Sequence, residues 1–145
     1  MQLESFFPYR LAVVAEAFSR QLVEVYGHAH GLTREEWRLL FLIEGAEEIN
    51  SLELARRTTL DKVQVSRATQ RLEDKGLILR SIPATDRRLR LYTITPLGRS
   101  TFAQAFRQVE ARANAILGAM SVEERAALET GLAALHRAVT GQAKA

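Results

Sequence analysis

Apolar residues recur every three to four positions along most of this chain, and the pattern changes only once, over residues 77–94. The recurrent spacing places apolar side chains on one face of a helix. Within the exception, two short apolar-rich runs, Leu77–Ile82 and Leu89–Ile94, flank the turn-forming segment Pro83–Arg88. The sequence therefore predicts a mainly α-helical fold with a small β-hairpin.

Capping residues and glycines indicate where the helices begin and end. Three pairs have the spacing of a capping box, in which each side chain bonds the other residue's backbone N–H. These pairs are Thr33 with Glu36, Asp61 with Gln64, and Ser121 with Glu124. Ser51 is expected to cap a short helix, Gly76 to end the next one, and Gly27 and Gly31 to bracket a loop. The predicted helices span residues 8–26, 33–45, 51–58 and 61–75, and two more lie within 96–140, one beginning at Pro96 and one at the Ser121 cap.

The composition excludes several classes of site. Cysteine is absent, so disulfides, Cys-ligated zinc and thiol-based redox sensing are ruled out. The N-terminus lacks the pattern of a signal peptide, and apolar runs such as Leu39–Ile43 are far too short to cross a bilayer. His28 and His30 alone are a weak signal for zinc, which needs about four ligands, and a solvated pair is the favoured interpretation. We expect a cytoplasmic protein with no membrane partner, no metal and no cofactor.

The sequence also lacks the motifs of common enzymes. It contains no phosphate-binding loop, no metalloprotease pair and no nucleophile elbow. The acidic pairs Glu35/Glu36 and Glu123/Glu124 lie in the first turns of predicted helices, where the helix dipole stabilises them. We therefore expect a protein that is not an enzyme.

Basic residues are concentrated in the centre of the chain. Residues 51–92 hold ten Lys or Arg and five Asp or Glu, whereas the net charge of the whole chain is only +3. Such clustering suits a surface that binds a polyanion. A solvated face with chance clustering explains the charge alone equally well.

The helices predicted over 51–58 and 61–75 are joined closely enough to form a helix-turn-helix. An α-helix fits the major groove of B-DNA, and its N-terminal residues meet the base edges. By itself, the second helix is also compatible with an ordinary amphipathic surface helix. Its candidate DNA-binding residues are Lys62, Val63, Gln64, Ser66, Arg67, Gln70 and Arg71.

The predicted hairpin carries a second basic cluster at its tip, formed by Asp86, Arg87, Arg88 and Arg90. A narrow hairpin tip allows a guanidinium group to enter a minor groove, where negative potential is concentrated. The alternative is a charged turn that prevents edge-to-edge pairing of strands. A helix-turn-helix followed directly by a basic hairpin is much more specific than either part alone.

Two motifs in this region resemble those of the MarR family of winged helix-turn-helix bacterial transcriptional regulators. The first is the segment Leu72–Ile78 at the end of the predicted recognition helix. The second is Asp86-x-Arg88 followed by Ile94-Thr95-x-x-Gly98, in which Ile94 stands where Leu is usual. The order of the predicted helices also agrees, so the resemblance covers nearly the whole chain.

The resemblance implies one domain over residues 1–145. Residues 33–94 would form the winged helix-turn-helix lobe, and helices within 8–27 and 96–140 would pair two subunits into a homodimer. Arg88 would enter the minor groove, and Asp86 would hold a wing or helix arginine in place. The implied function is sequence-specific binding of double-stranded DNA at an inverted repeat, as a repressor. A winged-helix module for protein or RNA contact is the alternative.

Members of this family often release DNA when an aromatic or phenolic acid binds. The candidate ligand-binding residues are Tyr9, Arg10, Trp37 and Arg38. An arginine can pair with a carboxylate, and a tryptophan can stack on a ring. The alternative, which we favour from the helical spacing, assigns Trp37 to the core and Arg10 to the surface or to an ion pair between subunits.

Overall fold

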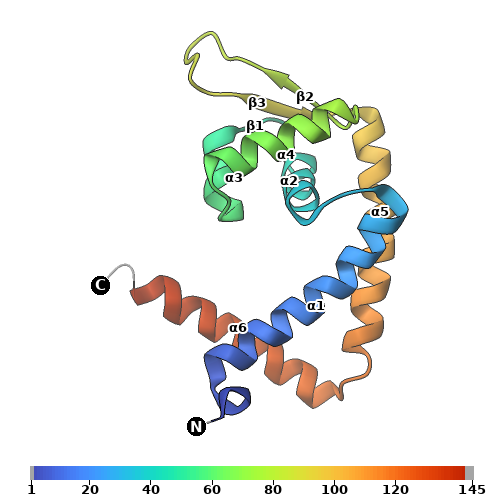
Figure 1. Ribbon diagram of the computed structural model, residues 1–145, viewed down its shortest axis with the longest axis vertical. Coiled ribbons are helices and arrows are strands. Elements are labelled where there is room, and N and C mark those ends of the chain that lie inside the picture. The colour runs from blue at the N-terminus through green and yellow to red at the C-terminus, as the bar shows by residue number, and fades with distance from the viewer. Residues whose placement is uncertain (1, 143–145) are drawn as a thin grey trace. The chain divides into compact units, whose positions relative to one another are not determined.

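The computed structural model describes residues 2–142 and divides into two compact units after Glu110. The first unit contains most of the secondary structure (Figure 1). Its elements are the 3₁₀ helix η1 (Leu3–Ser5), α1 (Phe7–His30), α2 (Arg34–Glu44), β1 (Ile49–Asn50), α3 (Ser51–Thr58), α4 (Lys62–Asp74), β2 (Ile78–Ser81) and β3 (Leu91–Ile94). The helix α5 (Pro96–Leu117) begins in this unit, and α6 (Val122–Gln142) belongs to the second.

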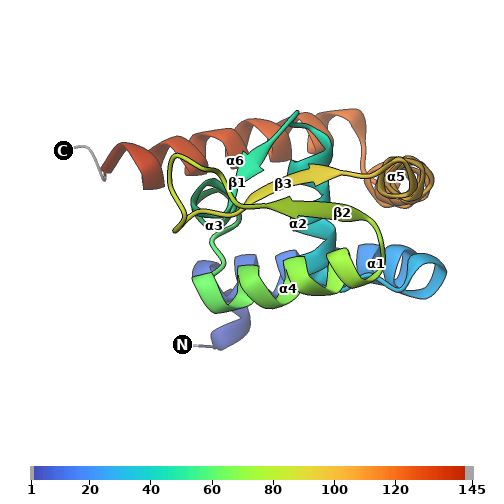
Figure 2. The same cartoon turned by 90° about the horizontal axis from the view of Figure 1, so that it is seen from above.

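The mainly α-helical class with a small sheet is confirmed, and the sheet has one more strand than predicted. The strand order is β1-β3-β2, and both pairings are antiparallel. Ile49 pairs with Tyr92 on one side of β3, and Ile78 pairs with Ile94 on the other. We call residues 78–94, which comprise β2, β3 and the loop between them, the wing; Figure 2 shows β3 between β1 and β2.

The core of the first unit forms where the apolar stripes of α2, α3 and α4 meet the sheet. Leu39, Leu40 and Ile43 of α2 are fully buried, as are Leu54 of α3 and Leu72 of α4. Burying a side chain of this size contributes about 1.5–3 kcal/mol relative to exposure. This packing fixes α4 against α2 and leaves the opposite side of α4 exposed.

Two predicted boundaries were wrong. Gly27 does not begin a loop: α1 continues to His30 and ends at Gly31, whose φ of 65° is the left-handed stop. His28 and His30 therefore lie in the last turn of α1. Glycine inside a helix costs only about 1 kcal/mol relative to alanine, so it did not break α1. The N-cap of α3 is Asn50, whose side chain accepts from the N–H of Glu53, and Ser51 is the first helical residue.

All three capping boxes form as predicted. Thr33 and Glu36 bond each other's backbone N–H, as do Asp61 and Gln64. The third pair opens α6: the N–H of Ser121 donates to Glu124 at 2.8 Å, and the N–H of Glu124 donates to the Ser121 hydroxyl at 3.0 Å. No helix within residues 2–142 is both long enough and apolar enough to span a membrane.

Candidate nucleic-acid interface

The buried and exposed sides of α4 use different residues. Val65, Ala68, Thr69 and Leu72 are buried and form the side that faces the core. The other side carries residues that were predicted to contact DNA. Exposed there are Lys62, Val63, Gln64, Ser66, Arg67 and Gln70.

Hydrogen bonds distinguish these exposed residues from one another. The side-chain oxygen Oε1 of Gln64 accepts from the N–H of Asp61 at 3.0 Å, because Gln64 belongs to the capping box. The Gln70 amide donates to Asp74 one turn later at 2.9 Å. Val63 is 56% exposed although it is apolar. The first turn of α4 thus offers an uncovered methyl surface beside cationic and polar groups.

Arg71 lies on a different side of α4 and has an intramolecular partner. Its Nε donates to the buried carboxylate of Glu36 on α2 at 2.8 Å. The side chain of Arg71 is 45% exposed, so part of the guanidinium group still faces solvent. Its DNA contact stays a prediction, and the bond to Glu36 gives it a second role.

The wing carries its basic residues in an ordered turn. The guanidinium group of Arg88 donates to both carboxylate oxygens of Asp86, at 3.1 and 3.2 Å, and the Arg88 N–H donates to the same carboxylate. These bonds hold the pKa of Asp86 below its ordinary value. Arg90 donates to the carbonyl oxygens of Arg87 and Leu89. The side chain of Arg88 is 91% exposed and is held in one orientation by Asp86.

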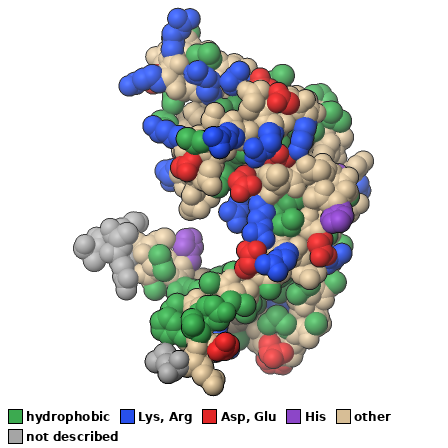
Figure 3. Space-filling model, viewed as in Figure 1, with side chains coloured by type: hydrophobic (Ala, Val, Ile, Leu, Met, Phe, Trp, Pro, Cys, Tyr) green, Lys and Arg blue, Asp and Glu red, His purple; other side chains and the backbone are tan. Residues whose placement is uncertain are grey.

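The helix and the wing share a groove of about 310 Å³. Lys62, Ser66 and Gln70 of α4 line one side, and Arg80, Arg88 and Tyr92 come from the wing. The hydroxyl groups of Thr69 and Tyr92 lie 3.3 Å apart beneath it. Figure 3 shows Lys and Arg side chains gathered over the region where α3, α4 and the wing lie in Figure 1. The groove therefore joins the two predicted basic clusters into one cationic surface.

Several residues of this surface were not predicted. Ser51, Leu52, Glu73, Arg80 and Tyr92 also line the groove. Arg80 is one of the basic residues concentrated in residues 51–92, so its charge could have indicated that it belongs to this surface. Tyr92 gave no such signal, because its role depends on a pairing of distant segments.

The candidate ligand-binding residues do not come together in one pocket. Tyr9 lines a hollow of about 330 Å³ along α1, and Arg10 is exposed outside it. Trp37 and Arg38 line a separate hollow of about 210 Å³ with Phe41 and Arg57. The two hollows share no residue.

Trp37 packs against the core, as the alternative interpretation expected. Its ring stacks on Tyr26 at a centroid distance of 5.1 Å and on Phe102 at 5.4 Å. Offset aromatic pairs at such distances stabilise by about 0.5–1.5 kcal/mol beyond their burial. Only part of this ring therefore remains for a ligand.

One of the two histidines of α1 has a polar neighbour on α5. His30 Nε2 lies 2.9 Å from Gln108 Oε1. In the described part of the chain, no three His, Cys, Asp or Glu side chains gather closely enough to hold a metal ion.

Comparisons with known proteins agree with this architecture. A model of the MarR family matches residues 30–89, which include α2, α3, α4 and most of the wing. An HTH-type transcriptional regulator of Bacillus subtilis (strain 168), YdgJ, is 29% identical over 106 residues, which are 73% of this chain and 65% of that protein. The chain spans less than two thirds of the length of the curated relatives it matches.

Solved structures show the same fold at low sequence identity. BpsR of Bordetella bronchiseptica, in a study of the regulation of its DNA binding by 6-hydroxynicotinic acid, has a TM-score of 0.82 and 19% identity; the match covers 94% of this chain and 96% of that one. A MarR variant from E. coli, in complex with operator DNA, has a TM-score of 0.77 and 24% identity; the match covers 86% and 89% of the two chains.

Proposed function

We propose that this chain belongs to the MarR family and is a transcriptional regulator that binds double-stranded DNA as a homodimer at an inverted repeat. The observation that carries the proposal is the shared groove, whose walls are the exposed side of α4 and the arginine-bearing wing. In this proposal α4 enters the major groove and Arg88 reaches the minor groove beside it. The operator-bound MarR variant supports the proposal through its similar fold.

The residues proposed to contact DNA fall into two groups. Lys62, Arg87, Arg88 and Arg90 would neutralise phosphates or enter the minor groove, and Val63, Ser66, Arg67 and Gln70 would face base edges. Gln64 would add a contact through the side-chain atoms that its capping bond leaves available, whereas Arg71, bonded to Glu36, would support α4 from the side. None of the groove-lining residues of α4 is aromatic, which favours duplex DNA over single-stranded RNA.

Apolar surface supports the proposed homodimer. Leu3, Phe6, Phe7 and Val14 are exposed at the N-terminal end of the first unit. Helix α6 has no buried residue among those described, and Leu128, Leu132 and Val139 are exposed on it. Large apolar side chains left exposed on each of these segments support a protein contact there. We propose that helices within 8–27 and 96–140 pair two subunits and that residues 33–94 form the DNA-binding lobe.

A small aromatic acid is the proposed effector, and repression released by that acid is the proposed mode of action. BpsR supports the effector class, because its DNA binding is described as regulated by 6-hydroxynicotinic acid. Trp37 and Arg38, with Arg57 nearby, would supply the aromatic and cationic contacts. A role without catalysis and a cytoplasmic location complete the proposal.

Selection of bound duplexes from a random DNA pool tests the function directly. The proposal expects an enriched inverted repeat whose half-sites are centred about 10 base pairs apart, one turn of B-DNA. Adding candidate aromatic acids should reduce recovery of the enriched duplex. A pool that stays random would contradict operator recognition and favour a protein-binding or RNA-binding module. Sedimentation of a folded 16.3 kDa monomer at micromolar concentration would contradict the homodimer.

A further inference from the structure

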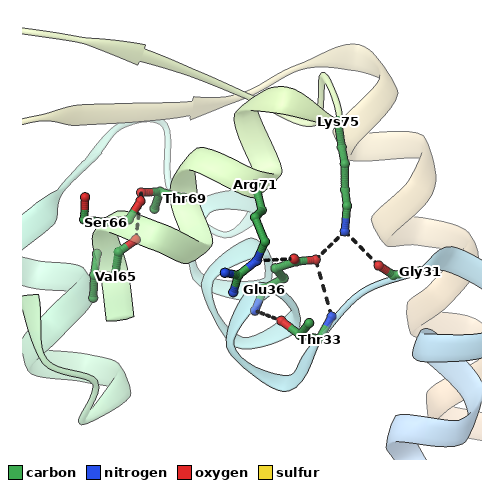
Figure 4. A network of polar contacts seen from close by, with 8 residues as sticks. All are labelled: Gly31, Thr33, Glu36, Val65, Ser66, Thr69, Arg71 and Lys75. Atoms are coloured by element: carbon green, nitrogen blue, oxygen red, sulfur yellow. Dashed lines mark hydrogen bonds and ion pairs between the residues drawn. The ribbon is translucent and has the colours of Figure 1, made fainter. Parts of the chain in front are cut away.

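Glu36 has contacts that its capping role does not require. Its side chain is 1% exposed, yet it carries a carboxylate. Oε1 accepts from Arg71 Nε at 2.8 Å, and Oε2 accepts from Lys75 Nζ at 2.6 Å and from the N–H of Thr33 at 3.3 Å (Figure 4). Arg71 lies in the last turn of α4 and Lys75 is the C-cap residue that follows it, whereas Glu36 lies in the first turn of α2.

A comparison within the chain separates these contacts from helix capping. Glu124 occupies the same capping position in α6 and accepts from the N–H of Ser121 at 2.8 Å. Glu124 is exposed, so a capping box does not need a buried carboxylate. A buried carboxylate is costly unless cations and hydrogen bonds compensate for its lost hydration. The burial of Glu36 therefore depends on Arg71 and Lys75.

The same cluster reaches a third segment. Lys75 Nζ also donates to the carbonyl oxygen of Gly31 at 2.7 Å, where α1 ends in a left-handed turn. One carboxylate and one ammonium group thus connect the end of α1, the start of α2 and the end of α4. We call Gly31, Glu36, Arg71 and Lys75 the helix junction.

We infer that Glu36 is a positioning residue for DNA recognition. Its bonds set the rotation of α4 about the helix axis. Arg71 in the last turn of α4 and Lys75 at its C-cap are four residues apart and bond the same carboxylate, so rotating α4 would break both bonds. Thr69 and Tyr92 hold the middle of the helix toward the wing. The inference rests on the proposed DNA function, and it assigns Arg71 an indirect role through Glu36.

The test compares Glu36→Gln with Glu35→Gln, which removes the same charge one residue away. Affinity is measured for the enriched inverted repeat and for a random duplex of equal length. Glu36→Gln should weaken the operator complex about tenfold, which corresponds to 1.4 kcal/mol. The affinity of Glu36→Gln for the random duplex should change by less than about twofold. The affinities of Glu35→Gln for the inverted repeat and for the random duplex should also change by less than about twofold. Equal loss on both duplexes, or no loss on either, would overturn the inference.

A double-mutant cycle tests whether Arg71 acts through Glu36. Arg71→Met should weaken operator binding in the wild-type background and add little in the Glu36→Gln background, because interacting residues are non-additive. A full additional loss would mean that Arg71 contacts DNA itself, which contradicts its indirect role. If Glu36→Gln does not fold, Lys75→Met replaces it: an unchanged ratio of operator to random affinity in Lys75→Met would then refute the inference.

Amide hydrogen exchange separates this inference from the proposed function. Exchange over residues 62–74 should be faster in Glu36→Gln than in Glu35→Gln, with or without DNA. If the wild-type protein bound no duplex in preference to the others, the proposed function would be refuted. Hydrogen exchange in Glu36→Gln would still show whether Glu36 stabilises α4. If exchange in α4 were the same in Glu36→Gln as in Glu35→Gln, the positioning role of Glu36 would be refuted.

Discussion

The guanidinium group of Arg88 bonds both carboxylate oxygens of Asp86, two residues before it in the wing. The most exposed arginine of the groove is therefore oriented by a neighbouring carboxylate. Ordering a long side chain costs about 0.5–1.5 kcal/mol, so a partner that orders it in advance favours binding.

Asp86→Asn tests this arrangement. Removal of a negative charge alone would strengthen binding to DNA, whereas loss of the bonds to Arg88 should weaken it. We expect a loss of about twofold to tenfold, from the ordering cost that Asp86 otherwise offsets. Fluorescence anisotropy with the enriched duplex measures the affinity. Glu47→Gln, which makes the same charge change at an exposed position outside the wing, is the control. Tighter binding by Asp86→Asn would show that the carboxylate only repels DNA.

Arg88→Ala should weaken binding to operator and unrelated duplexes together. Loss of one phosphate contact lowers the slope of log affinity against log salt by about 0.9. Titrations at several salt concentrations measure that slope. Arg20→Ala, which removes an exposed arginine from α1, should leave it unchanged. If Arg88→Ala matched this control in both affinity and slope, Arg88 would not touch DNA.

Val63 should contact the methyl group of a thymine, because it is an exposed apolar residue in the first turn of α4. Replacing the contacted thymine with deoxyuridine removes that methyl group. The wild-type affinity should fall about fourfold, which corresponds to about 0.8 kcal/mol for one buried carbon. Val63→Ala should respond less to the same replacement. Equal responses of the two proteins at every thymine of the half-site would argue against the contact.

Gly98→Ala and Gly131→Ala should change stability in opposite directions. A Cβ at Gly98 would lie 2.0 Å from the carbonyl oxygen of Leu77, whereas a Cβ at Gly131 meets nothing within 4 Å. Overpacking costs about 1–3 kcal/mol, and alanine inside a helix gains up to about 1 kcal/mol over glycine. Urea unfolding measures both. A stabilised Gly98→Ala would contradict the close approach of α5 to the start of the wing.

The stabilisation from Glu36 should disappear in acid. Burial of its carboxylate favours the neutral form, but the hydrogen bonds from Lys75 and Arg71 outweigh burial and lower its pKa. Its contribution is therefore complete above the unfolded pKa of about 4.3 and is lost as pH falls through the lower folded pKa. The difference in unfolding free energy between wild type and Glu36→Gln should shrink over that range. If the difference in unfolding free energy grew in acid, the pKa of Glu36 would be raised in the folded protein and not lowered.

The sequence was sufficient to predict elements that local chemistry determines. The helix-turn-helix, the wing and all three capping boxes depend on residues that are near one another in the chain. Strand β1 was missed because two residues are too few to show an alternation of apolar and polar side chains. The strand is defined by its pairing with β3. Glu36 was correctly predicted as a cap, but its bonds to Arg71 and Lys75 span 35 and 39 positions. Spacing along a sequence cannot indicate contacts of that range.

The division of α4 into separate inner and outer sides has a consequence for how such a protein diversifies. Val65, Ala68 and Leu72 maintain the fold, while Val63, Ser66 and Arg67 face solvent and take no part in the core. Under the proposed function, substitutions at the outer positions would alter the preferred operator with little change in folding free energy. After gene duplication, two copies could drift toward different promoters without passing through an unstable intermediate.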